Sequence, residues 1–437
     1  MTNKKIFIFG GARSGLAAAK VLTENNSIVI TDAKDFKEEE IQFFKKNNIE
    51  YYVTNTPENL IDNSFDIMVK NPGIHQKHKA IIKAKELDIE VINEMEVGFR
   101  LLKTKPFIIG VTGSNGKTTT VTLIYEMLKK LGVDVVLGGN IGYPFCDILE
   151  KINKESILLL EISDHQLLDF KEFKTNISLL TNVCPTHLDF HDGYDAYLST
   201  KKKIFNHHTK KDIAFINHSN EDSFKVTNDI DSTKIYFNNE INYINEIGIF
   251  VNNELIIKLE DIKLKGIHNY ENILAALMVL NEIKLDKEIV TQFLKNFNGV
   301  EHRVEFIKTI NGVSYYNDSK ATNPTSVITA LKTFNKPIHL ILGGLERTQN
   351  YEEILPFSKN VKCIYAIGEV TDRVCELAKK NNIKSIKSVT VKQAVLDIQQ
   401  NLSNDEIVLL SPGSASWDQY PKFEDRGDDF KKCVNSI

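Results

Sequence analysis

One short run of residues, T-G-S-N-G-K-T-T at 112–119, could bind the phosphates of a nucleotide. An apolar stretch at 106–111 predicts a buried strand before it, and helical apolar spacing continues from Thr118 onward. In such a strand–loop–helix unit, backbone N–H groups and the positive end of the helix face an anion. Lys117 would neutralise charge on the β- and γ-phosphates, and the Thr118 hydroxyl would bind Mg²⁺. The run therefore predicts a nucleoside triphosphate site.

The loop is a compact form of the phosphate-binding pattern. The general pattern has a glycine five residues before Gly116, where this chain has Val111, and the first loop glycine here is Gly113. We expect Asn115 and Thr119 to contact the nucleotide together with the two glycines. A glycine-rich turn before an ordinary helix is the alternative. The order of strand, loop, Lys-Thr pair and helix favours the nucleotide site.

Two further residues could bind a metal ion beside that loop. Glu161 ends an apolar run at 156–160, and His187 follows the next apolar run at 177–181. An acidic residue at a strand end after a phosphate loop typically serves the metal in phosphoryl transfer. A lone histidine is more often structural. Because His187 follows a strand, as Glu161 does, we predict that it is a metal ligand.

A second glycine-rich loop lies near the N-terminus. Residues 5–9 predict a strand, G-G-A-R-S-G follows at 10–15, and a helix and a second strand ending at Asp32 come next. This βαβ order could hold a pyrophosphate at the helix N-terminus. Since Ala12 takes the place of the middle glycine, the loop fits NAD, a UDP-sugar or merely a tight turn. A third loop, N-P-G at 71–73, follows another predicted strand.

These loops must be positioned by doubly wound α/β units, and the pattern predicts three of them. We place the boundaries at 1–98, 99–300 and 301–437. In the last unit, four predicted strands each end in a small or polar loop, with helix-compatible stretches between most of them, which indicates another doubly wound α/β domain. These strands lie at 314–316, 338–342, 363–367 and 407–410.

The bulk composition excludes several classes of protein. A length of 437 residues is enough for about three domains. A formal net charge of −4 gives no hint of nucleic-acid binding. The five cysteines include no C-x-x-C pair, so neither a disulfide framework nor a zinc site is expected. No run is long enough for a signal peptide or a membrane span, so we expect a cytoplasmic protein without membrane insertion, by default a monomer.

The joint order of the motifs resembles the Mur ligase family, the ATP-dependent amide-bond-forming enzymes of peptidoglycan synthesis. The motifs are T-G-S-N-G-K-T-T, L-E-I-S-D-H-Q-L, N-V-C-P-T-H-L-D, G-I-H-N-Y-E-N-I-L-A-A, E-H-R-V-E and N-D-S-K-A-T-N-P. Two further runs, L-I-L-G-G-L-E-R and L-S-P-G-S-A-S-W-D-Q-Y, resemble runs of the family member that joins D-glutamate to UDP-N-acetylmuramoyl-L-alanine. The resemblance covers essentially the whole chain. It implies a Rossmann-like UDP-binding domain, a central P-loop ATPase-like domain and a C-terminal Rossmann-like domain for the amino acid.

The resemblance also implies roles for individual residues around ATP and two Mg²⁺ ions. Glu161 and His187 would bind the metals directly or through water, and Lys117, His187 and Lys201 would be catalytic. The residues matched to the adenine, the γ-phosphate and the ribose are, in that order, Asn269 and Asn272, Arg303, and Asp318.

Two further groups of residues match the family's substrate positions. Those expected around UDP-N-acetylmuramoyl-L-alanine are Ser14, Asp32, Asn71, Gly73 and Asn140. Those expected around D-glutamate are Lys320, Thr322, Arg347, Ser416 and Phe423. Arg347 departs from the lysine of many relatives, but an arginine still supplies a cation for a carboxylate. His165 replaces a residue that is often aromatic and apolar in relatives.

Lys201 matches a family lysine that reacts with CO₂ to form a carbamate, which would hold the second Mg²⁺. Three lysines stand in a row at 201–203, and Tyr197 precedes Lys201 by four residues, as in relatives. We expect Lys202 and Lys203 to lie on a solvated face.

Three other functions remain open from the sequence. Another member of the superfamily, such as a folylpolyglutamate synthase, would also add glutamate, but it would lack the βαβ unit before the phosphate loop. A nicotinamide dehydrogenase could use the loop at 10–15 and Asp32, but it leaves Lys117, Glu161 and His187 unexplained. A nucleotide-switched binding module would bind ATP without catalysis.

Overall fold

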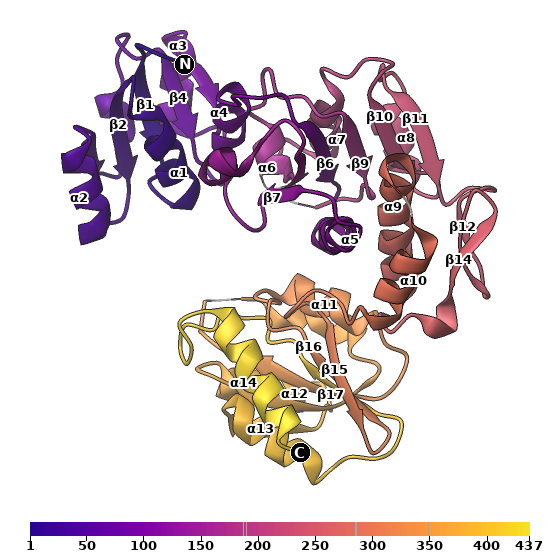
Figure 1. Ribbon diagram of the computed structural model, residues 1–437. Helices are drawn as coiled ribbons and strands as arrows, with labels where there is room; N and C mark the ends of the chain where they lie inside the picture. Colours follow the sequence, from indigo (N-terminus) through magenta and orange to yellow (C-terminus); the bar gives the residue numbers. More distant parts are fainter. Residues whose placement is uncertain (187, 189, 285, 348) are drawn as a thin grey trace. The chain divides into compact units, whose positions relative to one another are not determined.

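The computed structural model describes residues 1–186, 188, 190–284, 286–347 and 349–437. The chain divides into two units, whose helices and strands are labelled in Figure 1. The first unit consists of Met1–Leu259 and Glu271–Phe293, and the second of Glu260–Tyr270 and Leu294–Ile437. Among the described residues, no helix combines the length and the apolar character that a transmembrane helix needs.

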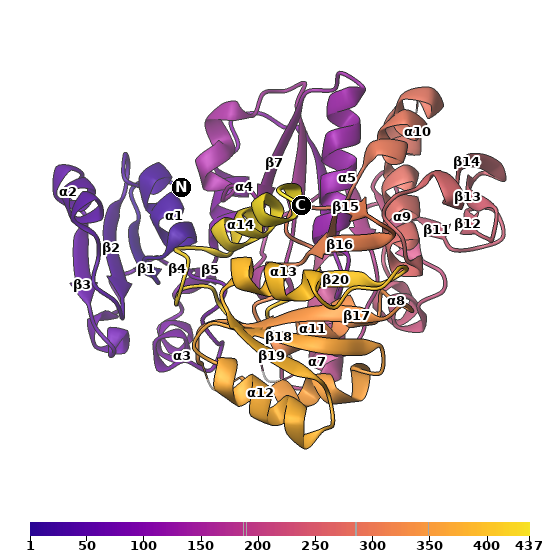
Figure 2. The ribbon, with the colours of Figure 1, turned by 90° about the horizontal axis from the view of Figure 1, so that it is seen from below.

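The N-terminal sheet of the first unit is parallel, with the strand order β3-β2-β1-β4-β5 (Figure 2). Its strands are β1 (Lys5–Phe9), β2 (Ser27–Asp32), β3 (Glu50–Val53), β4 (Ile67–Lys70) and β5 (Glu90–Ile92). Its helices are α1 (Arg13–Leu22), α2 (Glu38–Lys46), α3 (Lys79–Glu86) and α4 (Glu94–Arg100). Helices α1, α2 and α4 pack on one face and α3 on the other, so β1 is apolar and buried from Ile6 to Phe9. The strands predicted at the N-terminus are confirmed.

The central sheet of the first unit is also parallel, in the order β11-β10-β9-β6-β8-β7. Its strands are β6 (Phe107–Thr112), β7 (Val135–Gly139), β8 (Ile157–Glu161), β9 (Ile177–Leu180), β10 (Ile213–Asn217) and β11 (Thr233–Phe237). Its helices are α5 (Lys117–Lys130), α6 (Asp164–Leu167), α7 (Tyr194–Lys202) and α8 (Glu221–Thr227). Because β6 lies between β8 and β9, the loops that follow these three strands meet at one edge of the sheet.

Smaller elements follow the central sheet. A three-stranded antiparallel sheet contains β12 (Tyr243–Ile244), β13 (Gly248–Val251) and β14 (Glu254–Lys258). Helices α9 (Ile267–Ile283) and α10 (Lys287–Asn296) contribute residues to both units. The short 3₁₀ helices are η1 (Pro57–Leu60), η2 (Cys146–Lys151), η3 (Lys203–Phe205), η4 (Leu259–Asp261) and η5 (Tyr351–Phe357).

The sheet of the second unit has the order β15-β16-β20-β17-β18-β19. Its strands are β15 (Glu305–Ile310), β16 (Val313–Asn317), β17 (Ile338–Gly343), β18 (Val361–Ile367), β19 (Ser385–Val389) and β20 (Ile407–Leu410). Helices α11 (Pro324–Leu331) and α12 (Thr371–Lys380) cover one face, and α13 (Val391–Gln399) and α14 (Phe423–Asn435) cover the other (Figure 2). The four predicted strands are confirmed. The two edge strands, antiparallel β15 and parallel β19, were not predicted.

A buried ion pair links the end of β4 to the segment after α6. Lys70 Nζ lies 3.0 Å from Asp169 Oδ2, and both side chains are almost completely buried. The ammonium also donates to the Ile74 carbonyl at 3.0 Å, and Gln76 donates to the other Asp169 oxygen at 2.7 Å. Burial lowers the pKa of Lys70, and the charge of Asp169 opposes that shift. The pair therefore fixes the N-P-G loop against the central part of the same unit.

We expect Lys70→Met to destabilise the first unit by about 3–5 kcal/mol, because it leaves the Asp169 carboxylate buried without its cation. The double variant Lys70→Met/Asp169→Leu should recover much of that loss. Thermal unfolding followed by circular dichroism measures both. Lys4→Met is the matched control, since it removes one partner of the exposed Lys4–Asp66 pair. An equally small effect of Lys70→Met and Lys4→Met would contradict this role of the buried pair.

Candidate functional site

The predicted phosphate loop joins β6 to α5, and its two glycines have backbones that other residues rarely adopt. Gly113 has φ 150° and Gly116 has φ 82°. A Cβ on Gly113 would clash with the Thr181 hydroxyl, and one on Gly116 would clash with the Asn272 amide. Both positions therefore require glycine for conformation and for space. Thr118 and Thr119 follow in the first turn of α5.

The segment after β9 holds the phosphate loop by reciprocal hydrogen bonds. The Ser114 N–H donates to the Asn182 carbonyl at 2.9 Å, and the Asn115 N–H donates to the Asn182 side chain at 3.0 Å. The Thr181 hydroxyl donates to the Asn115 carbonyl at 2.7 Å. Lys117 folds back over the loop, with Nζ donating to the carbonyls of Gly113 and Ser114 at 2.8 and 3.0 Å. The loop is thus shaped by the protein itself.

Lys201 lies under the same loop, at the end of α7. Its side chain is fully buried, and Nζ donates to the Gly113 carbonyl at 2.9 Å and to the Thr112 hydroxyl at 3.3 Å. Burial, reinforced by the positive charge of Lys117, lowers the pKa of Lys201 to about 7. The expectation for its neighbours is only partly met. Lys202 pairs with Asp229, but Lys203 is half-buried and donates to the Leu168 carbonyl at 2.6 Å.

The sequence reasoning missed two buried residues beside Lys201. Asp164 begins α6, and one carboxylate oxygen lies 3.7 Å from Lys201 Nζ. The other oxygen lies 2.8 Å from His191 Nε2, and the His165 Nδ1 atom is 3.4 Å from it. His165 packs against the ring of Phe190 at 3.9 Å between centroids. Asp164 stands inside one of the motifs quoted above, but no pattern in the sequence signalled His191.

Glu161 ends β8 next to the strand that enters the phosphate loop. Its side chain is buried, and one oxygen accepts a hydrogen bond from the Asn140 amide at 2.8 Å. The other oxygen, Oε2, has no hydrogen-bond partner among the described residues. A buried carboxylate oxygen without a partner is costly, and a cation would satisfy it. Glu161 therefore fits a metal ligand, and Asn140, which is expected at the substrate, also orients Glu161. His187 lies outside the described residues.

The two asparagines of α9 differ in their surroundings. The Asn272 side chain occupies the space beside Gly116, and its Oδ1 lies 3.4 Å from the Thr120 hydroxyl. Asn269, one turn earlier, donates to the Lys265 carbonyl at 2.8 Å. Both are buried. Asn272 is thus in contact with the phosphate loop itself, which is compatible with a place beside the nucleotide.

The residues expected at the UDP-containing substrate come together where the strand order of the N-terminal sheet reverses. The Asn71 amide donates to the Ser14 hydroxyl at 3.3 Å and accepts from the Gly73 N–H at 3.0 Å. Asp32 accepts from the Gly11 N–H at 2.7 Å, at the end of the neighbouring strand. Ligands of open α/β sheets bind outside the carboxyl ends of strands at such a reversal.

In the second unit, Asp318 follows β16 and is almost fully buried. It accepts hydrogen bonds from the Ser411 hydroxyl at 2.7 Å and from the Val304 N–H at 3.2 Å. Burial raises the pKa of Asp318 to about 7. Val304 has φ 44°, a strained conformation for a β-branched residue. Asp318 therefore anchors a strained segment that carries Arg303.

Arg426, which the sequence reasoning missed, is buried below the loops after β16 and β20. It donates to the hydroxyl and the carbonyl of Ser319 at 3.0 and 2.9 Å and to the Ser414 carbonyl at 3.0 Å. The residues expected around the amino acid lie on these loops and nearby: Lys320 and Ser416 on the loops, Thr322 before α11, and Phe423 at the start of α14. Ser416 is buried and Thr322 is exposed.

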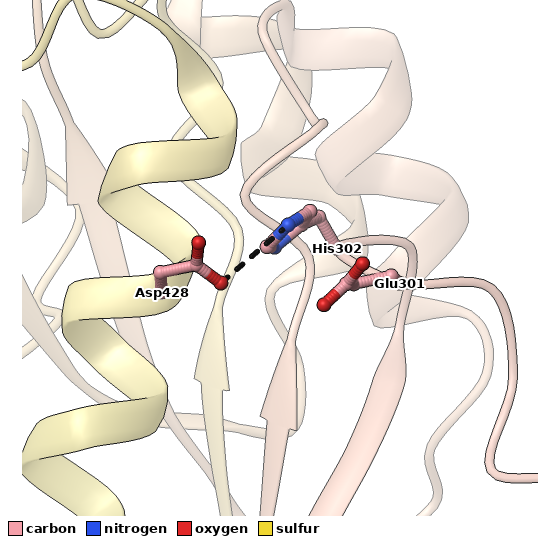
Figure 3. A group of neighbouring side chains, drawn as sticks. All are labelled: Glu301, His302 and Asp428. Atoms are coloured by element: carbon pink, nitrogen blue, oxygen red, sulfur yellow. Dashed lines mark ion pairs between the residues drawn. The ribbon is translucent and has the colours of Figure 1, made fainter. Parts of the chain in front are cut away.

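A possible metal site in the second unit is formed by Glu301, His302 and Asp428, whose ligand atoms lie within 4.8 Å of one another (Figure 3). His302 Nε2 points towards Asp428 on α14, at 3.8 Å. The ammonium of Lys431 lies 3.0 Å from Asp428 and also pairs with Glu301. A protein cation thus already neutralises these carboxylates.

A parallel sheet whose central strand runs through a glycine-framed loop into a helix defines the class of P-loop nucleotide-binding proteins. Comparison with known proteins narrows this class. The Mur ligase middle domain matches residues 111–280, and the glutamate ligase domain of Mur ligases matches residues 302–413. The chain belongs to the Mur ligase family. The family resemblance of the motifs is confirmed, and with it the activity class of an ATP-dependent amide-bond-forming ligase.

Relatives align over the whole chain. The UDP-N-acetylmuramoylalanine–D-glutamate ligase of Leuconostoc mesenteroides is 37% identical over 444 residues, which cover 99% of this chain and 98% of that protein. The protein of the same name from a Geobacillus species is 38% identical over 443 residues, which again cover 99% of this chain and 98% of that protein.

Solved structures share the fold. UDP-N-acetylmuramate-alanine ligase MurC from Thermotoga maritima aligns with a TM-score of 0.60 at 19% identity, covering 99% of this chain and 100% of its own. MurF ligase from Thermotoga maritima in complex with ADP aligns with a TM-score of 0.58 at 17% identity, covering 100% and 96%. The predicted α/β fold class is confirmed.

We expect Gly116→Ala to weaken ATP binding and to destabilise the first unit. The left-handed backbone costs an alanine about 1–2 kcal/mol, and the clash with Asn272 adds about 1–3 kcal/mol. Gly132→Ala is the matched control, because Gly132 has φ 73° but a Cβ there would meet nothing within 4 Å. Thermal unfolding and calorimetric titration with ATP measure the two variants. Equal losses in both would show that backbone strain alone, without the Asn272 contact, requires the glycine.

Proposed function

We propose that this protein joins D-glutamate to UDP-N-acetylmuramoyl-L-alanine at the expense of ATP, in peptidoglycan precursor synthesis. The observation that carries the proposal is the alignment of relatives with that named activity over 98–99% of both chains. Residues 1–98 form the UDP-substrate domain, residues 99–300 the ATP domain and residues 301–437 the amino-acid domain. A reaction between free nucleotides and an amino acid belongs in the cytoplasm, and a monomer is sufficient for it.

The chemistry follows from the poor reactivity of a carboxylate towards nucleophiles. An oxygen of the alanine carboxylate attacks the γ-phosphorus of ATP, and ADP leaves, so that an acyl phosphate forms. The amine of D-glutamate then attacks the acyl carbon, phosphate leaves, and the nitrogen loses a proton to give the amide. In this sequence of steps, Lys117 and Arg303 neutralise charge on the transferred phosphoryl group. Residues Gly113, Asn115, Gly116 and Thr119 present the loop, and Asp318 meets the ribose.

The residues around the phosphate loop fit a divalent cation. The unpartnered Oε2 of Glu161 and the Thr118 hydroxyl offer the oxygen ligands that Mg²⁺ prefers. Thr118, Glu161, His187 and Lys201 are the proposed metal ligands, at two Mg²⁺ sites. When bound, Mg²⁺ supplies positive charge that offsets the crowded phosphate and carboxylate oxygens. Asn140 holds Glu161 in the orientation that leaves Oε2 available.

The proposed substrate residues are those that match the family's substrate positions, and their chemistry suits the two substrates. Ser14, Asn71 and Gly73, already linked by hydrogen bonds, and Asp32 offer donors and acceptors for the UDP portion. Lys320, Thr322 and Arg347 offer two cations and a hydroxyl for a dicarboxylic amino acid, with Ser416 and Phe423 beside them. Asn269 and Asn272 flank the base of ATP.

The decisive experiment measures ADP release by the purified protein with ATP, UDP-N-acetylmuramoyl-L-alanine and one amino acid at a time. We expect turnover with D-glutamate and none with L-lysine or diaminopimelate. Lys117→Ala should lower turnover at least about 100-fold, because it removes a cation that acts on the transferred group. It should leave binding of the UDP substrate intact, since that site is formed by the N-terminal sheet.

Each alternative gives a different result in that assay. A folylpolyglutamate synthase would turn over with a folate and L-glutamate instead. A nucleotide-switched binding module would release no ADP under any combination. ADP release that does not depend on an acceptor amino acid would contradict the ligase.

We expect Lys201→Ala to be nearly inactive and to regain part of its activity in acetate. The proposed modification forms a bond between the neutral Lys201 nitrogen and the carbon of CO₂, with release of one proton. The product is an anion, and acetate would replace its carboxylate in the space left by the shortened side chain. The supporting observation is the burial of the amine against the phosphate loop.

Lys202→Ala is the matched control, because its ammonium pairs with Asp229 on the surface. Full activity of Lys201→Ala together with an inactive Lys202→Ala would shift the assignment by one residue. Full activity of both variants would rule out the carbamate.

A further inference from the structure

Two strand-end loops of the second unit bring an arginine and the single tryptophan of the chain together. Arg347 lies on the loop after β17, and Trp417 lies on the loop after β20, the neighbouring strand. The Leu345 N–H donates to the Ala415 carbonyl at 3.0 Å, so the two loops are hydrogen-bonded just before both residues. The Cζ atom of Arg347 lies 4.3 Å from the centroid of the Trp417 ring.

The backbone on both sides of this contact is fixed. The Gln349 side chain accepts from the Arg347 N–H at 2.8 Å and donates to the Leu345 carbonyl at 3.0 Å, which closes the first loop. In the second loop, the Ser416 carbonyl accepts from the Tyr420 N–H at 2.8 Å. Arg347 and Trp417 therefore lie on two loops whose backbones are fixed by hydrogen bonds, and the Trp417 indole provides a flat surface for the Arg347 guanidinium.

The exposure of Trp417 calls for an explanation. Trp417 is 61% exposed, although the residues before it, from Ser411 to Ser416, are all buried. A long exposed arginine samples many rotamers, and an indole face restricts these because it attracts a planar cation. Glu346 is adjacent to Arg347 in the chain, and its carboxylate could compete with a substrate carboxylate for the Arg347 guanidinium. The Glu346 carboxylate also pairs with Arg373, at 3.2 Å.

We propose that Trp417 is a positioning residue for Arg347 and that this stacked pair sets the affinity for the dicarboxylic acceptor. The inference rests on the proposed function, which places Arg347 at D-glutamate. The indole holds the guanidinium plane in the orientation in which its edge meets a carboxylate by two parallel hydrogen bonds. A lysine at position 347 would offer a point charge without that plane.

The first test uses the fluorescence of Trp417, which reports on the pair directly because the chain has no other tryptophan. D-glutamate is titrated into the protein holding UDP-N-acetylmuramoyl-L-alanine and a non-hydrolysable ATP analogue. We expect a saturable change in emission, because the carboxylate alters the charge beside the ring. Arg347→Met should abolish the change. A change that persists in Arg347→Met would overturn the proposal.

The second test separates a positioning role from a direct one by kinetics. We expect Trp417→Ala to raise the KM for D-glutamate about 3- to 10-fold with little change in kcat or in the KM for ATP. Trp417→Phe should restore most of the affinity, and Trp417→Leu should not. In the Arg347→Met background, Trp417→Ala should add nothing. A further rise in KM there, or equal behaviour of the Phe and Leu variants, would overturn the proposal.

Phe357→Ala is the matched control, since Phe357 forms another exposed cation–π pair in the same unit, with Lys332 Nζ 4.4 Å from the ring centroid. We expect it to leave both KM values unchanged, and a rise like that of Trp417→Ala would overturn the proposal. The two hypotheses also fail separately. ADP release with D-glutamate but no fluorescence response overturns the inference alone. If both assays respond to a different amino acid, D-glutamate is wrong as the acceptor, but the proposed role of the Arg347–Trp417 pair stands.

Discussion

In each of the three large sheets, a buried cation donates hydrogen bonds to carbonyl groups of a loop at the carboxyl ends of the strands. Lys70 binds the Ile74 carbonyl after β4, Lys201 binds the Gly113 carbonyl after β6, and Arg426 binds the carbonyls of Ser319 and Ser414. A loop carbonyl buried away from water must have a donor. A long cationic side chain can reach it from another element, and so it fixes the loop from below. These loops carry Asn71, proposed for the UDP substrate, Gly113, proposed for the phosphates, and Lys320, proposed for the amino acid.

The cations themselves are stabilised unequally. Lys70 has a close carboxylate partner at 3.0 Å. Among the described residues, the carboxylate that pairs with Lys201 is that of Asp164, which is 3.7 Å away and also lies close to His191. Burial lowers the pKa of Arg426 to about 10, which leaves it charged at neutral pH. Of the three side chains, Lys201 thus has the weakest support for a positive charge, which agrees with the neutral amine that the proposed carbamate requires, and it is also the one under the phosphate loop. The weakest support for a positive charge and the position under the phosphate loop therefore coincide at Lys201.

Much of the fold was predictable from the sequence because central parallel strands are buried on both faces. Their continuous apolar runs, as in β8 and β20, end at polar residues that are visible in the sequence. Strands β15 and β19 were missed because edge strands carry polar residues, as S-I-K-S-V in β19 shows. Single site residues could be proposed where a motif spaced them, as at Lys117 and Glu161. The contacts of His191 with Asp164 and of Trp417 with Arg347 could not be predicted, because the partners lie on other elements. Lys203 was wrongly expected on a solvated face because its partner, the Leu168 carbonyl, is distant in sequence.

The contact between Gly116 and the Asn272 side chain also restricts how related sequences can diverge. The two residues are far apart in the chain, yet the amide fills the space that any larger side chain at position 116 would need. A lineage that loses the glycine must therefore shorten the residue at 272 as well, and one that enlarges the residue at 272 must move the helix away. The pair should accordingly vary together or not at all, which links the evolutionary record of the loop to that of a helix encoded much later in the chain.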